Sequence, residues 1–144
     1  DALCQGGPAV LEKQFGTRFH TCQHAAGVKD GDFFDFGDVT LKVIDIPGHT
    51  AGAVAYLAEA DGKVILFIGD MFSLQGATPQ DEIIIDPGWD GGPDFDAKKN
   101  VDSFELLKTL NPQIIAPGHS SIYIGDGQGV LKKAANTAKE RYRD

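Results

Sequence analysis

The chain has 144 residues, 42% of them hydrophobic and 24% charged, which is typical of one globular domain and excludes a disordered or fibrous chain. Thirteen basic and 21 acidic residues give a net charge of −8, the wrong sign for gripping a nucleic-acid backbone. The longest apolar run, residues 64–68, is far shorter than the ~20 residues of a membrane-spanning helix. We therefore expect a single domain over residues 1–144 that is soluble and cytoplasmic and binds neither nucleic acid nor membrane.

The first predicted elements are a helix over residues 8–15 and a short strand over residues 18–22. From Phe34 onwards the hydrophobic period changes to two, which predicts a meander of four strands. These strands occupy residues 34–36, 39–46, 53–58 and 63–68, with turns at Gly37-Asp38 and Asp61-Gly62.

Residues 75–97 lose this periodicity and accumulate glycine and proline, which indicates a long loop. A helix follows, because apolar residues recur at helical spacing and a proline ends the pattern. The residues of this apolar stripe are Val101, Phe104, Leu107 and Leu110. Residues 113–116 are predicted to form a short buried strand, and residues 130–142 a closing helix. Strands and helices in this mixed order predict an α+β fold.

Three short motifs each place a metal-ligating side chain just past a predicted strand. His49 lies in Pro-Gly-His-Thr-Ala-Gly, Asp70 in Gly-Asp, and His119 in Pro-Gly-His. The glycine before each ligand lets the backbone bend sharply at a sheet edge, so two imidazoles and one carboxylate can converge there. Such ligands suit zinc, and also iron or manganese. The alternative for each residue is structural, because a histidine or aspartate after a strand often serves only a hydrogen bond or a turn.

In their order and spacing these motifs resemble the metallo-β-lactamase-fold hydrolase superfamily over nearly the whole chain. The matching segments are Pro47-Gly48-His49-Thr50-x-Gly52, Gly69-Asp70 and Pro117-Gly118-His119. The resemblance implies part of an αββα sandwich, namely its C-terminal sheet with flanking helices, with the N-terminal strands missing.

The same resemblance implies a two-metal hydrolase. His49 would bind the first metal, Asp70 would bridge both as the catalytic carboxylate, and His119 would bind the second. Two zinc ions, or iron or manganese, lower the pKa of a bound water, and the resulting hydroxide attacks an ester, lactone, lactam or thioester. The expected partner is therefore a small-molecule substrate.

The first motif of the family, His-x-His-x-Asp-His, does not occur in the chain. Asp1 matches the aspartate of that motif, with Ala2 where its last histidine belongs; the alternative is that Asp1 belongs to an unrelated terminus. The remaining ligands supply at most two per metal, whereas catalytic zinc usually has three. We therefore expect a missing N-terminal segment or a second chain to complete the fold, the alternative being a diverged domain that has lost full catalysis.

Two aromatic residues are candidate substrate contacts. Trp89 lies in the loop between the second and third motifs, where its alternative role is to anchor that loop, and Tyr123 follows the last motif. The sequence after Asp70 lacks the Gly-Cys-Gly-Arg-like stretch of the glyoxalase II and persulfide dioxygenase branches, which argues against both. Two other functions stay open: a non-catalytic interaction domain on the same fold, and a mononuclear iron enzyme of persulfide dioxygenase type.

Overall fold

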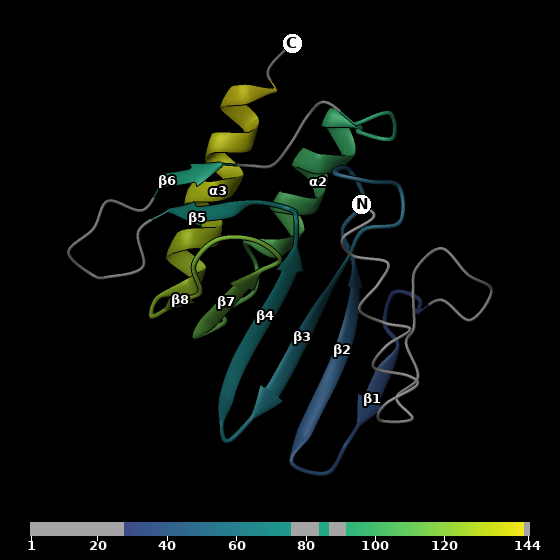
Figure 1. Ribbon diagram of the computed structural model, residues 1–144, viewed down its shortest axis with the longest axis vertical. Helices are drawn as coiled ribbons and strands as arrows, with labels where there is room; N and C mark the ends of the chain where they lie inside the picture. The colour runs from purple at the N-terminus through teal and green to yellow at the C-terminus, as the bar shows by residue number, and fades with distance from the viewer. Residues whose placement is uncertain (1–27, 76–83, 87–91, 143–144) are drawn as a thin grey trace.

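The computed structural model describes residues 28–75, 84–86 and 92–142 (Figure 1). One sheet has six strands in the order β1-β2-β3-β4-β7-β8, and a second sheet pairs β5 with β6. The strands are β1 (Phe33–Asp35), β2 (Val39–Asp45), β3 (Val54–Ala60), β4 (Lys63–Gly69), β5 (Ser73–Gln75), β6 (Ile84–Asp86), β7 (Ile114–Pro117) and β8 (Tyr123–Ile124). The helices of the described part are α2 (Ala97–Leu107) and α3 (Gly127–Arg141), and neither has the length and apolar character that crossing a membrane requires.

The predicted meander of four strands is confirmed, since β1 to β4 pair in succession and each pair is antiparallel. Asp61 and Gly62 have φ angles of 49° and 69° between β3 and β4, values that suit a tight hairpin turn. β7 pairs with β4 in parallel. Parallel strands need a crossover connection, and the segment between β4 and β7 includes α2. The predicted helix over residues 8–15 and strand over residues 18–22 lie outside the described residues.

The core lies between one face of the six-stranded sheet and the two helices (Figure 1). Ile44, Leu66 and Ile115 are buried on this face, on β2, β4 and β7. The helix residues packed against them are Phe104, Leu107, Val130, Leu131, Ala134, Ala135 and Ala138. The predicted apolar stripe of α2 is confirmed, because its central residues are fully buried and its outer ones pack at the margin of the core.

The opposite face of the sheet is also apolar, and no described helix covers it. Val43, Tyr56 and Phe67 are cross-strand neighbours on this face. Phe67 lies on a central strand yet is 42% exposed, and Ile124 at the edge is 73% exposed. Val43 on the same face is fully buried, so the face is apolar but only partly exposed.

The structure adds elements that the sequence does not predict. β6 lies within the predicted loop over residues 75–97, and β5 and β8 lie just after the second and third motifs. Each has two or three residues, too few to show a hydrophobic period. Helix α3 begins at Gly127 rather than residue 130, because the Asp126 carboxylate caps it by accepting a hydrogen bond from the Gly129 N–H.

Glu105 joins the two helices. Its carboxylate lies 2.6 Å from Lys108 Nζ on α2 and 2.9 Å from Lys139 Nζ on α3. Hydrogen bonds from Lys108 and then Lys139 hold the pKa of Glu105 below its ordinary value. The carboxylate side chain is 31% exposed, so water screens these ion pairs and their stabilisation is modest.

We expect Glu105→Gln to lower the free energy of unfolding by about 0.5–1 kcal/mol near pH 7. Because the folded-state pKa is lowered, this stability is fully present above the unfolded-state value near 4.5 and is lost as the pH falls through the folded-state value. Urea unfolding at neutral and strongly acidic pH measures both effects. Asp102→Asn, which breaks an exposed ion pair within α2, is the control and should cost less. A difference between Glu105→Gln and wild type that persists in acid would contradict this assignment.

Candidate metal centre

Three strands carry the three motifs to one edge of the sheet. β2 and β4 run in the same direction, because each is antiparallel to β3 between them, and β7 is parallel to β4. The arrowheads of β2 and β4 lie at the same end of the sheet in Figure 1. His49, Asp70 and His119 all follow the C-terminal ends of these strands. The topology thus gathers the loops that bear all three candidate ligands.

Asp70 and His119 lie side by side at this edge. His119 Nε2 is 3.5 Å from Asp70 Oδ1, and the two side chains are 78% and 47% exposed. This distance is too long for a strong hydrogen bond. It is close to the ~3.4 Å between two ligand atoms of one tetrahedral metal with bonds of about 2.0–2.1 Å. The pair therefore has the separation and the access from solvent that a metal ion needs.

Two glycines allow these loops to touch. The Gly118 N–H donates to the Gly69 carbonyl oxygen at 2.6 Å. A Cβ on Gly118 would lie 2.5 Å from Asp70 Oδ1, so any side chain at that position would displace the carboxylate. Gly69 has a φ of +52°, which glycine adopts without strain as the chain leaves β4 towards Asp70.

The His49 loop is fixed separately, against the start of α2. The Asp96 N–H donates to the Gly48 carbonyl oxygen at 2.9 Å, and the Ser103 hydroxyl donates to the Pro47 carbonyl oxygen at 2.7 Å. These bonds hold the two residues that directly precede His49. His49 itself is partly buried, and its Nδ1 atom is buried with no hydrogen-bond partner in the described part.

Helix α2 approaches this loop at unusually short range. Gly48 has a φ of +138°, and a Cβ there would lie 2.3 Å from the Cα atom of Asn100. Only glycine permits this contact. Asp96 caps the helix, since its carboxylate accepts a hydrogen bond from the Lys99 N–H, and this bond lowers the pKa of Asp96. The cap and the contact with Gly48 together set where α2 begins relative to the loop.

The described residues contain no group of three or more His, Cys, Asp and Glu side chains that could hold a metal ion. The structure brings Asp70 and His119 together and leaves His49 on a neighbouring loop outside that pair. The chemistry of this pair fits a metal ion, but it supplies only two of the three or four protein ligands that a zinc site uses.

The other predicted site residues lie elsewhere. Asp1 and Trp89 are outside the described residues. Tyr123 lies on β8, where its ring packs against the core and its hydroxyl lies beside Gly125. Its part in substrate binding stays a prediction.

Ser120 forms a structural hydrogen bond directly after His119. Its φ is +77°, and its hydroxyl accepts a hydrogen bond from the Leu74 N–H at 2.8 Å. The Ser121 N–H donates to the Leu74 carbonyl oxygen at 3.3 Å. These bonds tie the segment after His119 to β5, which follows Asp70. The Asp70 and His119 loops are therefore hydrogen-bonded to each other both before these two residues, through Gly69 and Gly118, and after them.

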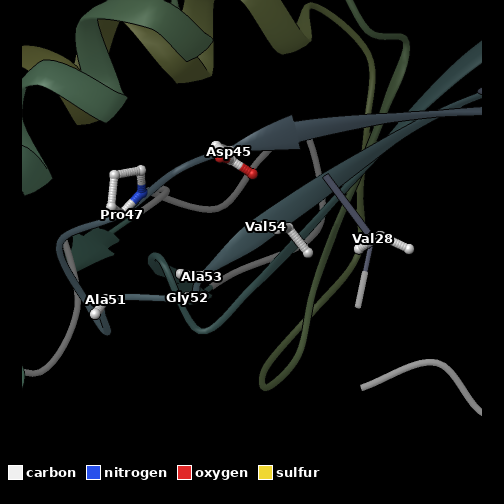
Figure 2. Close-up of a pocket in the computed structure, with 7 residues that line it drawn as sticks. All are labelled: Val28, Asp45, Pro47, Ala51, Gly52, Ala53 and Val54. Carbon is white, nitrogen blue, oxygen red and sulfur yellow. The ribbon is translucent and has the colours of Figure 1, made fainter. Parts of the chain in front are cut away.

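A small depression of about 170 Å³ lies on the flank of the His49 loop. Figure 2 shows its lining where β2 leads into the loop and the loop returns into β3. The residues that line it are Val28, Asp45, Pro47, Ala51, Gly52, Ala53 and Val54. Among the described residues that line it, Asp45 alone is charged, and the volume is below the 300–1,000 Å³ or so of typical ligand pockets. The depression on its own therefore does not make a substrate site.

Residues 18–119 match the family model described as the metallo-beta-lactamase superfamily, which spans well over half of the chain and includes all three motifs. The chain belongs to the metallo-β-lactamase superfamily. The resemblance found in the sequence is thereby confirmed.

Curated relatives match the chain at moderate identity. An uncharacterized protein of Mycobacterium leprae is 30% identical over 122 residues, which are 84% of this chain and 52% of that protein. A hydroxyacylglutathione hydrolase of Brucella anthropi is 33% identical over 98 residues, which are 68% of this chain and 30% of that enzyme. The chain thus spans about half or less of the length of these relatives. The argument against the glyoxalase II branch, to which hydroxyacylglutathione hydrolases belong, stays a prediction.

Solved structures of the superfamily share the fold. ETHE1 from Myxococcus xanthus superposes with a TM-score of 0.60 at 16% identity, covering 94% of this chain and 63% of that one. The family protein TTHA1429 from Thermus thermophilus gives 0.59 at 18% identity, covering 98% and 47%. The predicted fold class, an α+β portion of the superfamily's sandwich, is confirmed.

We expect Gly118→Ala to weaken zinc binding by about tenfold or more, because its Cβ would occupy the space of Asp70 Oδ1. The free energy of unfolding should fall modestly, since the Cβ would displace the end of a flexible side chain but would also lie 3.2 Å from the backbone C and O atoms of Gly69. Competition with a chromophoric chelator measures the affinity. Gly92→Ala, where a Cβ meets nothing within 4 Å, is the matched control. Equal affinities for the two variants would show that the Asp70 carboxylate does not depend on Gly118.

Proposed function

We propose that this chain forms part of a metal-dependent hydrolase that acts on a small-molecule ester, lactone, lactam or thioester. The observation that carries the proposal is the 3.5 Å separation of Asp70 Oδ1 and His119 Nε2 where β4 and β7 end. Membership of the superfamily and the similarity to hydroxyacylglutathione hydrolases support hydrolytic chemistry. When bound, metal ions in such a site polarise the scissile carbonyl group and lower the pKa of water.

The side chains of this chain would divide the work of holding the metals. Asp70 supplies a negative charge between the two histidine loops, where it can bridge two cations and offset part of their charge. His119 lies beside it on an exposed loop, whereas His49 comes from a loop that is hydrogen-bonded to α2. The net charge of −8 favours a neutral substrate over a strongly anionic one.

We also propose that further polypeptide, either an N-terminal segment or a second chain, covers the open face of the sheet and supplies the remaining ligands. Two observations support this. Phe67 is 42% exposed on a central strand, and the relatives extend well beyond the matched region. A second layer on this face would bury Phe67, whose cross-strand row already includes the buried Val43.

The metal ligands can be tested by single substitutions. Asp70→Ala should abolish binding of both metals because the bridging carboxylate is lost, while His119→Ala should remove one. Zinc content and affinity are measured on the chain and on its full natural protein, together with chelator-sensitive hydrolysis of ester, lactone, lactam and thioester panels. Asp38→Ala, in the turn between β1 and β2, is the control carboxylate.

The hydrolysis panel tests the enzyme proposal itself. Failure of the full protein to hydrolyse any of these substrates would refute the hydrolase proposal and favour a non-catalytic interaction domain. Oxygen consumption with a thiol or persulfide substrate would indicate an iron enzyme.

A separate prediction concerns the apolar sheet face that contains Phe67. The 144-residue chain alone should bind an environment-sensitive hydrophobic dye and self-associate, and Phe67→Lys should reduce both by charging the centre of the apolar face. Dye fluorescence and sedimentation velocity measure these effects. Leu106→Lys changes a residue that is 46% exposed on α2 and should have the smaller effect. A chain that is monomeric and binds no dye would refute the proposed covering layer.

A further inference from the structure

Asn100 is a fully buried polar residue that contacts the loop that carries His49 and the loop that carries Asp70. It lies near the start of α2, with an exposed fraction of 0%. Its backbone touches Gly48, which precedes His49, and its Nδ2 atom lies 3.8 Å from Sδ of Met71, which follows Asp70. Its Oδ1 atom is buried and has no hydrogen-bond partner among the described residues. A buried amide oxygen in this state costs free energy that an apolar side chain would avoid.

His49 carries the complementary atom. Its Nδ1 is likewise buried without a hydrogen-bond partner in the described part of the chain. A protonated Nδ1 donates, whereas an amide Oδ1 only accepts. His49 Nδ1 can therefore supply the donor that Asn100 Oδ1 needs, and Asn100 Oδ1 the acceptor for a protonated His49 Nδ1.

The backbone brings the two side chains within reach. A Cβ on Gly48 would lie 2.3 Å from the Cα atom of Asn100, so the Cα atoms of these two residues are at most about 3.8 Å apart. His49 is one peptide further, which places its Cα within about 7.6 Å of that of Asn100. A hydrogen bond between His Nδ1 and Asn Oδ1 can span about 9 Å between Cα atoms, since each polar atom reaches about 3 Å and the bond adds about 2.9 Å.

We propose that Asn100 is a positioning residue for His49: the two atoms are not hydrogen-bonded to each other in this structure, and a rotation of the side chains would let the His49 Nδ1–H donate to Asn100 Oδ1. This bond fixes the tautomer in which Nε2 is free to bind a metal. Histidine ligands that donate their other ring N–H are held in one orientation and bind metal more tightly. The consequence for metal binding rests on the proposed function, whereas the hydrogen bond itself does not. Through Met71, Asn100 also links the His49 loop to the Asp70 loop.

The test reads the protonation of the His49 ring nitrogens by two-bond nitrogen–proton NMR, in the metal-free full chain and after addition of zinc. In wild type we expect the Nδ1-protonated tautomer in both states. Asn100→Leu removes the acceptor and should lose this tautomer, with zinc affinity about 10–100-fold lower. Asn100→Asp keeps an acceptor oxygen and should retain the tautomer. Asn100→Ala replaces the leucine variant in the same comparison if that variant does not fold.

Ser103→Ala is the matched control, because it removes another buried polar contact between α2 and the same loop. It should leave the tautomer of His49 unchanged. An identical tautomer in wild type and Asn100→Leu, or an unprotonated Nδ1 in wild type, would overturn the proposal. If wild type binds no zinc but Asn100 still sets the tautomer, the positioning role stands and the proposed metal function fails.

Discussion

The parallel pairing of β4 with β7 is the constraint on which the candidate site depends. It places Gly118 against Gly69, and so His119 beside Asp70. Parallel pairing also demands a long crossover, and α2 lies within it. Helix α2 in turn packs on the core, and its cap residue Asp96 and its Ser103 hydroxyl are hydrogen-bonded to the His49 loop. One strand pair thus determines the position of two ligand loops directly and of the third through the helix that it requires.

The two sides of the site are held by different means. The Asp70 and His119 loops touch through glycine backbones, which leaves both side chains exposed and free to adjust. The His49 loop is fixed by hydrogen bonds to its backbone from Asp96, which caps α2, and from the buried Ser103 on that helix.

Much of this arrangement can be predicted from the sequence because it rests on local signals. Asp61 and Gly62 specify a hairpin, the period of two marks the meander, and the glycines before Asp70 and His119 mark strand ends. Asn100 gives no such signal. Asn100 is buried against Gly48, which lies 52 positions earlier in the sequence. A single polar residue in a helical pattern is instead predicted to lie on the surface. The short strands β5, β6 and β8 escape prediction for a similar reason, since tertiary hydrogen bonds such as that from Leu74 to Ser120 define them.

The two edges of the six-stranded sheet have a consequence for how the protein can associate. β1 has three residues and β8 has two, so neither offers a long row of free backbone N–H and C=O groups. Short edges of this kind discourage the strand-by-strand growth that leads to fibrils. Strand pairing at these edges is therefore a poor route by which one molecule could extend the sheet of another.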